Sequence, residues 1–270
     1  MEMLSRFALL VMLFGFSMPC LSAGPDGAGN SVQRDGGDSP PIVSAQERQV
    51  AERPKLRETE PVFLLVIDPG HPSEIAAGSS LLNGVREVEI NWQVAVGLRD
   101  LLAREPGMKV LLTRAVAGQM MTNRNRAEFG NREKAALMLR LHCDAGAKSG
   151  FAIYFPSAQG KIQGTVGPSA EVIMKSGKAA KTLHAGMAPR LDGILPDKGI
   201  LTDRQTAVGA KNGALIGSIF SRIPILTVKM ACLTEAGDAG FIASPDGQKA
   251  MIEALAAGIR LIRDDRKNAK

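Results

Sequence analysis

Residues 63–72 read FLLVIDPGHP, and this stretch decides which fold class the sequence predicts. A short aliphatic run that ends in Pro-Gly is typical of a strand buried on both faces and stopped by a turn. Such strands belong to α/β sheets, whose sites form outside the carboxyl ends of the strands. His71 follows the strand directly, at that edge of the sheet. A lone histidine there is more often a surface residue without a function, so the rest of the chain has to decide.

Strand-like and helix-like patterns alternate through the rest of the chain. The predicted strands are residues 62–68, 108–113, 136–143, 150–155 and 223–230. The predicted helices are residues 87–104, 170–190 and 205–220, and a last helix that begins at Ser244 and has its N-cap there. The Gly- and Pro-rich segments 156–170 and 191–204 are expected to be loops. This alternation predicts one α/β domain over residues 59–265, with a mainly parallel or mixed sheet flanked by helices.

The first 58 residues predict an exported protein. Residues 7–18, FALLVMLFGFSM, follow Arg6 and precede small residues, as in a cleavable signal peptide that ends near Ala23. This apolar run is too short for a membrane span, which needs roughly 20 residues, so no stable span is expected after cleavage. Residues 24–58 are polar and rich in Gly and Pro, which predicts a disordered linker. We therefore expect the protein in the periplasm or the cell envelope.

The overall charge favours an anionic partner. The net charge is +6, which suits nucleic acid, an acidic envelope polymer or a membrane surface. Nucleic acid is disfavoured, because aromatic residues make up only 4% of the chain and Lys and Arg are spread along it. After cleavage two cysteines remain, Cys143 and Cys232, and both are expected to be small buried thiols.

A second histidine also stands at the end of a strand. In residues 137–142, LMLRLH, leucines alternate with other residues, so His142 faces the side of the sheet opposite to the leucines. Two imidazoles at one sheet edge suggest a metal, and Zn²⁺ usually takes a third protein ligand and leaves one position for water. Glu87 is the candidate, although the first turn of a helix favours a carboxylate in any case. Spacing does not separate it from its rivals Glu89, Glu74 and Asp144.

Four motifs in order resemble the zinc-dependent N-acetylmuramoyl-L-alanine amidases. They are VIDPGHP, then REVEIN at a helix start, then VLLTR, then a stretch that ends in AALMLRLHCDAG. The resemblance covers about residues 62–262. It implies that His71, Glu87 and His142 bind Zn²⁺. It also implies hydrolysis of the amide between the lactyl group of N-acetylmuramic acid and L-alanine in peptidoglycan, a substrate that suits an exported basic protein.

The resemblance fails at the family's catalytic glutamate. That residue lies on a late strand, and the ungapped match to PILTVKMACLTEAGD places Lys229 at its position. A charged lysine cannot accept a proton, so the resemblance predicts impaired catalysis unless another acid substitutes. Glu235 and Asp144 are the candidates for that role. Two smaller departures are Arg140, where the family has a small residue, and Pro72, where it has glycine.

We therefore expect a zinc amidase of the cell wall whose catalytic competence is in question. Two alternatives remain open: a peptidoglycan-binding protein without activity, and a zinc peptidase that acts on stem peptides. The sequence identifies no activating protein partner.

Overall fold

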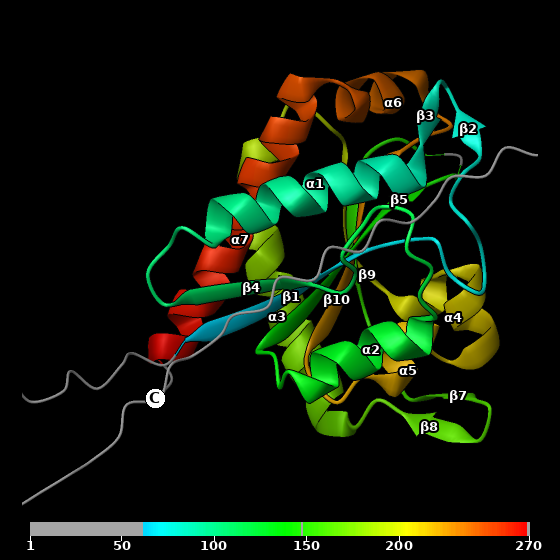
Figure 1. Cartoon of the computed structure of the whole chain (residues 1–270), viewed down its shortest axis with the longest axis vertical. Helices are drawn as coiled ribbons and strands as arrows, with labels where there is room; N and C mark the ends of the chain where they lie inside the picture. Colours follow the sequence, from blue (N-terminus) through cyan, green and yellow to red (C-terminus); the bar gives the residue numbers. More distant parts are fainter. Residues whose placement is uncertain (1–61, 147, 269–270) are drawn as a thin grey trace, which may run out of the picture. The chain divides into compact units, whose positions relative to one another are not determined.

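The structure is a computed structural model that describes residues 62–146 and 148–268. The predicted signal peptide and linker lie outside the described residues. Within these residues one large sheet has the strand order β4-β1-β5-β10-β6-β9 (Figure 1). Its strands are β1 (Phe63–Pro69), β4 (Met108–Leu112), β5 (Leu137–Asp144), β6 (Phe151–Phe155), β9 (Asp197–Thr202) and β10 (Ile225–Cys232).

The sheet is mostly parallel, which confirms the predicted fold class. Strands β4, β1, β5 and β10 run parallel to one another, while β6 is antiparallel to β10 and parallel to β9. The five predicted strands are all present. The expectation of loops at 156–170 and 191–204 was wrong, because these segments hold β9 and a small hairpin, β7 (Gly160–Ile162) and β8 (Thr165–Gly167). A second hairpin joins β2 (Leu81–Leu82) to β3 (Val85–Arg86).

The predicted helices are present, with one correction. The helix predicted over 205–220 is divided, because Gly213 ends its first part with a left-handed φ of 91°. No helix of the described part is long and apolar enough to cross a membrane. The helices are α1 (Glu87–Leu102), α2 (Asn123–Arg132), α3 (Ala170–Leu191), α4 (Ala207–Asn212), α5 (Ile216–Phe220), α6 (Ala236–Ala243) and α7 (Pro245–Asn268), with a 3₁₀ turn at Asp203–Gln205.

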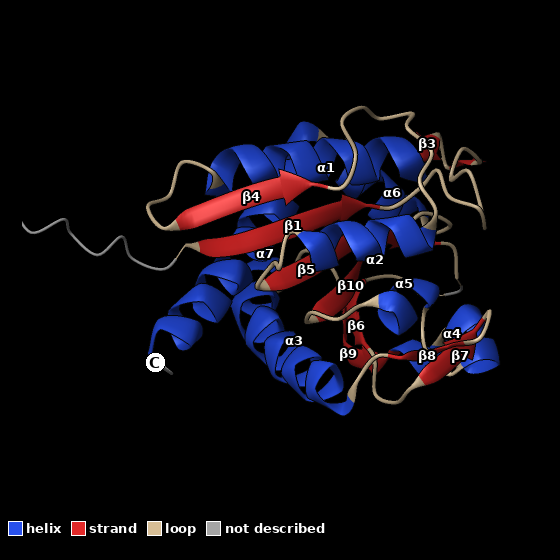
Figure 2. Cartoon of the chain, turned by 60° about the horizontal axis from the view of Figure 1, so that its bottom comes forward, coloured by secondary structure: helices blue, strands red, loops and turns tan. Residues whose placement is uncertain are grey.

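One face of the sheet carries the main hydrophobic core. Helices α1, α3 and α7 cover this face, and α2 and α5 lie on the other (Figure 2). The strands contribute alternate residues to the core, so the leucines of β5 point into it as the alternation predicted. Burial of this apolar surface is the main term that stabilises the domain. The strand residues at its centre are Leu65, Ile67, Leu137, Leu139, Leu141, Phe151, Ile153, Leu226 and Val228.

The opposite face becomes polar toward the carboxyl ends of the strands. The strand register places three rows across it, because paired residues of neighbouring strands point to the same face. In order toward the carboxyl ends, the rows are Val66, Met138 and Ile225, then Asp68, Arg140 and Thr227, then His142 and Lys229. The first row packs against α2 as a small second core, and the later rows carry the chemistry.

Candidate metal centre

Three of the residues singled out in the sequence converge at the carboxyl ends of β1 and β5. His71 follows β1, Glu87 is the first residue of α1, and His142 lies near the end of β5. His71 Nε2 is 3.1 Å from one carboxylate oxygen of Glu87, and His142 Nδ1 is 2.9 Å from the other. The two imidazole rings meet edge to face, with their centroids 5.0 Å apart. All three side chains are partly exposed, so solvent reaches the cluster.

The His71 ring is held by its own loop. Its backbone adopts a left-handed φ of 57°, which is uncommon for a residue other than glycine. Its Nδ1 donates to the carbonyl oxygen of Ala76 at 3.0 Å, which leaves Nε2 directed at Glu87. Gly78 passes so close that a Cβ there would lie 2.6 Å from His71 Cβ. The loop therefore fixes both the position of the ring and the nitrogen that it presents.

Glu87 is fixed at the start of α1. One of its carboxylate oxygens accepts a hydrogen bond from the backbone N–H of Cys143 at 3.0 Å, in addition to its contact with His142. Burial alone raises the pKa of Glu87, but hydrogen bonds with both histidines and the charge of Lys229 outweigh it and hold the pKa far below its usual range. Glu87 is thus a carboxylate at any physiological pH.

The His142 ring lies against the backbone of Gly70. A Cβ at Gly70 would be 2.4 Å from His142 Cε1, so only glycine leaves room for the ring in this place. Burial lowers the pKa of His142 to about 4, even though Glu87 opposes this shift. The imidazole is therefore neutral near pH 7, the state in which histidine binds metals.

The donor set fits a divalent transition metal. When the single proton of neutral His71 is on Nδ1, its Nε2 lone pair faces a carboxylate oxygen, and only a cation or an added proton can relieve this contact. Ligand atoms around tetrahedral Zn²⁺ are roughly 3.3 Å from one another. The histidines lie 3.1 Å and 2.9 Å from different oxygens of Glu87, and one donor atom of each of the three residues lies within 4.8 Å of the others. Two histidines and one carboxylate are also a usual protein set for catalytic zinc.

A buried network of arginines supports the loop that carries His71. Arg126, which is fully buried, donates to Asp68 at 2.6 Å and to the carbonyl oxygens of Pro69 and Pro72 at 2.8 Å and 2.7 Å. Arg114 donates to the carbonyl oxygens of Pro69 and Gly70. These charge-assisted hydrogen bonds fix the backbone on both sides of His71.

Asp68 is the acid at the centre of this network. It accepts hydrogen bonds from Thr113 at 2.6 Å and Arg140 at 2.9 Å as well as from Arg126. Burial raises its pKa, but Arg126 and Arg140 lower it to about 2. We assigned no role to Asp68 or Arg126 from the sequence. The signal was present, since an acid inside a strand buried on both faces requires a charged partner.

A cleft of about 420 Å³, lined by both polar and apolar side chains, opens beside the cluster. His71 and His142 line it together with Lys229, whose Nζ donates to the carbonyl oxygen of Cys143 at 2.8 Å. Arg140, Asp144, Tyr154 and Thr227 belong to its walls, and residues 205–208 with the start of α5 close the far side. A substrate that reaches the histidines would therefore meet Lys229.

The rival acids lie in different places. Glu89 is exposed and faces Arg86 at 3.6 Å, while Glu74 accepts hydrogen bonds from the backbone and side chain of Asn123. Asp144 lines the cleft, where its carboxylate is 3.3 Å from Lys198 Nζ. Glu235 precedes α6, beyond the end of β10, and is not among the described residues that line the cleft. Cys143 and Cys232 are both buried and free, as expected.

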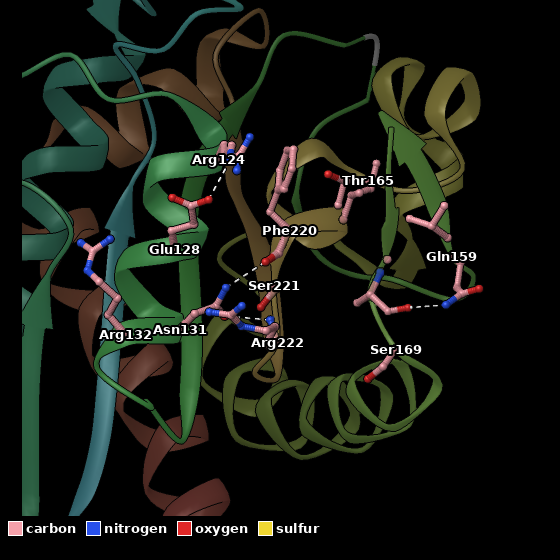
Figure 3. A pocket seen from close by; sticks show the side chains of 14 residues that line it. Arg124, Glu128, Asn131, Arg132, Gln159, Thr165, Ser169, Phe220, Ser221 and Arg222 are labelled. Carbon is pink, nitrogen blue, oxygen red and sulfur yellow. Dashed lines mark hydrogen bonds and ion pairs between the residues drawn. The ribbon is translucent and has the colours of Figure 1, made fainter. Parts of the chain in front are cut away.

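A separate recess lies between α2, α5 and the β7–β8 hairpin (Figure 3). Asn131 of α2 donates to the carbonyl oxygen of Phe220 at 2.9 Å and accepts from the backbone N–H of Arg222 at 2.7 Å. Arg124 pairs with Glu128 at its rim. None of the candidate site residues lines this recess. Its hydrogen bonds join α2 to the segment that ends α5, which holds α2 where Arg126 reaches the His71 loop.

Comparisons with known proteins agree with the geometry. A family model described as N-acetylmuramoyl-L-alanine amidase matches residues 65–261. The amidase CwlM of Bacillus licheniformis is 28% identical over 163 residues, which are 57% of this chain and 63% of that protein, so the chain spans somewhat less than two thirds of this relative.

Solved structures share the fold. The catalytic domain of the amidase CwlV from Bacillus (Paenibacillus) polymyxa var. colistinus superposes with a TM-score of 0.59 at 20% identity, over 74% of this chain and 98% of that one. The amidase Ami1 of Mycobacterium smegmatis gives a TM-score of 0.62 at 16% identity, over 76% and 98%.

Proposed function

Since the chain belongs to the N-acetylmuramoyl-L-alanine amidase family, we propose that it acts on peptidoglycan, at the amide between the lactyl group of N-acetylmuramic acid and L-alanine. The observation that carries the proposal is the convergence of His71, Glu87 and His142 beside an open cleft. An exported location, as the first 23 residues predict, would bring the protein to this substrate.

We further propose that His71, Glu87 and His142 hold Zn²⁺. When bound, the metal supplies Lewis acidity, which polarises an amide carbonyl and makes water a better nucleophile near neutral pH. The chain contributes the arrangement of the donors. The hydrogen bonds of His71 to Ala76 and of Glu87 to Cys143 orient two of them, and the contact with Gly70 fixes the third. Such outer contacts tune metal sites and keep them selective.

Lys229 stands at the position where the resemblance places the catalytic base. Hydrolysis of an amide needs a group that accepts a proton from water and returns one to the leaving amine. The resemblance assigns that task to the position of Lys229, and its Nζ lies in the cleft, held by the carbonyl oxygen of Cys143. A protonated lysine has no lone pair for this purpose. It can donate a hydrogen bond to the oxyanion that forms from the amide carbonyl. We therefore propose slow or undetectable turnover.

A second function, binding of peptidoglycan without cleavage, is favoured by the presence of lysine at position 229. With lysine there, the metal ligands and the cleft are retained, but the catalytic base is missing. A protein of this kind would retain ligand affinity and lack product formation. The two functions share a site and differ in one residue.

Incubation with purified wall sacculi separates the proposals. New L-alanine amino termini in the products support the amidase, and binding to sacculi without any product supports the binding protein. Cleavage within the peptide cross-links would instead identify a peptidase. The Glu87→Ala variant is the matched control, because loss of a metal ligand should abolish every metal-dependent product.

A further inference from the structure

Two side chains, Lys229 and Arg140, give the cleft a positively charged wall. Lys229 and Arg140 stand on neighbouring strands, on the same face of the sheet as His142. Both line the cleft. They are also two of the positions at which the chain departs from the pattern of the amidases that it resembles.

The Lys229 ammonium is positioned to bind a ligand. An ammonium has three donors, and the carbonyl oxygen of Cys143 occupies one of them at 2.8 Å. Among the described residues no carboxylate lies within 4.0 Å of its Nζ, since it takes part in no ion pair. Its charge is therefore available to a group that enters the cleft beside His71 and His142.

Arg140 adds a second positive charge, one row of side chains before Lys229 on the same face of the sheet. Its guanidinium is buried, and it donates to Asp68 and, at 2.6 Å, to Asn123 Oδ1. Asp68 also pairs with Arg126, so one carboxylate faces two guanidinium groups. Space for Arg140 depends on Gly217 of α5, where a Cβ would be 2.6 Å from Arg140 Nη1. The cation is thus built into the wall of the cleft.

Two carboxylates lie near this wall: Glu87, which is held between His71 and His142, and Asp144 in the lining of the cleft. Asp144 is the acidic residue among the described residues that line the cleft, and its carboxylate faces Lys198. The hydroxyl groups of Tyr154 and Thr227 lie on the same sheet face as Lys229 and can donate hydrogen bonds. A buried carboxylate, Asp203, interacts with Arg140 from the turn before α4, but it does not line the cleft.

We propose that Lys229, supported by Arg140, binds a carboxylate of the peptide part of the ligand, on the residue next to the L-alanine that is joined to the muramoyl group. This inference rests on the proposed function, because it takes the histidine cluster as the place where the muramoyl amide lies. A free carboxylate in that residue would bind more tightly than a carboxamide, since a charge-assisted hydrogen bond is about twice as strong as a neutral one.

The test compares two ligands that differ in one group. They are N-acetylmuramoyl-L-alanyl-D-glutamic acid and the form whose α-carboxyl is a carboxamide. Calorimetry gives their affinities for the purified full chain and for Lys229→Gln, with Lys229→Arg as the conservative variant. The matched control is Lys161→Gln, an exposed lysine on β7 outside the cleft. Each titration is repeated with EDTA, because a carboxylate can also bind a metal directly.

We expect the full chain to prefer the carboxylate form by at least about tenfold. The preference should fall below about twofold in Lys229→Gln, persist in Lys229→Arg and Lys161→Gln, weaken with salt, and survive EDTA. Equal affinities, or no binding of either form, would overturn the inference. A preference that EDTA removes and Lys229→Gln retains would also overturn it, since the metal would then hold the carboxylate.

This outcome is separate from that of the proposed function. Hydrolysis of sacculi together with equal affinities would refute the carboxylate site and leave the amidase assignment standing. A preference that depends on Lys229 in the absence of any product would support the carboxylate site and favour the binding protein over the amidase.

Discussion

Lys229 lies beside His142 in the parallel register of β10 and β5, and both side chains point to the same face of the sheet. A cation is thereby placed in the row that carries a candidate metal ligand. The charge of Lys229 contributes to holding the pKa of Glu87 low and to lowering that of His142. Lys229, which departs from the family pattern, thus affects the pKa values of two residues that match the pattern, Glu87 and His142.

Replacement of Lys229 by glutamate should convert a weak enzyme into an active one. The carboxylate would stand where the resemblance places the base, and general acid–base catalysis typically contributes roughly 10²–10⁴-fold. Release of L-alanine amino termini from sacculi measures the gain. Lys229→Gln is the matched control, because it removes the charge without providing a base, and it should show little activity.

Glu235 provides the counter-test. Because it lies outside the cleft lining, Glu235→Gln should leave turnover unchanged. If the unmodified protein is fast and Glu235→Gln abolishes its activity, then Glu235 is the base and Lys229 does not limit the reaction.

The metal ligands should be distinguishable from the remaining histidine. His71→Ala and His142→Ala each remove one donor, so bound zinc after dialysis should fall well below one equivalent, as measured by atomic emission. His184→Ala is the control, since His184 on α3 pairs with Asp197 at 2.7 Å. Equal loss of zinc in all three variants would contradict the assignment.

Gly70→Ala should impair metal binding without removing a ligand. The new Cβ would overlap the His142 ring, so the ring must move away from Glu87. Displacement of a ligand by its surroundings commonly lowers metal affinity roughly 10–100-fold. Competition with a fluorescent zinc chelator measures this change. Gly118→Ala is the control, because a Cβ there would meet nothing within 4 Å, and unchanged affinity in both variants would refute the steric argument.

Asp68→Asn should destabilise the fold. It leaves Arg126 and Arg140 without their shared acid, and loss of one partner from a buried ion pair costs about 3–5 kcal/mol in the free energy of unfolding. Urea denaturation measures this cost. Asp100→Asn, which removes an exposed pair with Arg99, should change the same quantity by less than about 1 kcal/mol.

The same variant should alter the acid dependence of stability. The pKa of Asp68 is about 2 in the folded chain, below its ordinary value of 3.8, so its contribution to stability is present above pH 3.8 and is lost as the pH falls through 2. Asp68→Asn should therefore show a smaller decrease of unfolding free energy between pH 4 and pH 2. An unchanged slope would mean that Asp68 is not the group that titrates.

The strongly patterned parts of the fold could be predicted from the sequence. The five predicted strands contain continuous or alternating apolar runs, and α1 has a regular apolar stripe, so local pattern and tertiary burial agree. Helix α2 was missed because its buried positions are Asn123, Arg126, Ala127 and Gly130, which form no apolar stripe. Strand β9 was missed because it is only partly buried and contains Gly199 with a φ of 75°.

The site could be predicted only as far as strand ends could be located. His71 and His142 follow from the rule that parallel strands place their carboxyl ends at one edge. The choice of Glu87 over Glu89 came from the resemblance, because both acids lie in the first turn of α1 and their spacing does not separate them. The structure shows that Glu87 contacts both histidines. The arginine network depends on residues up to 72 positions apart, such as Arg140 and Asp68, which no local pattern brings together.

The arginines that hold the His71 loop bind its carbonyl oxygens, and this has a consequence for the order of assembly. The loop is anchored to the protein interior through Arg114 and Arg126, so its shape does not depend on a bound ion. The donors are therefore set in place when the chain folds, unlike those of small zinc domains that collapse only around their metal. Chelation should empty the site while the chain stays folded, with a lower melting temperature because a bound ion stabilises only the folded state. Zinc added back should then bind at once, without a refolding delay.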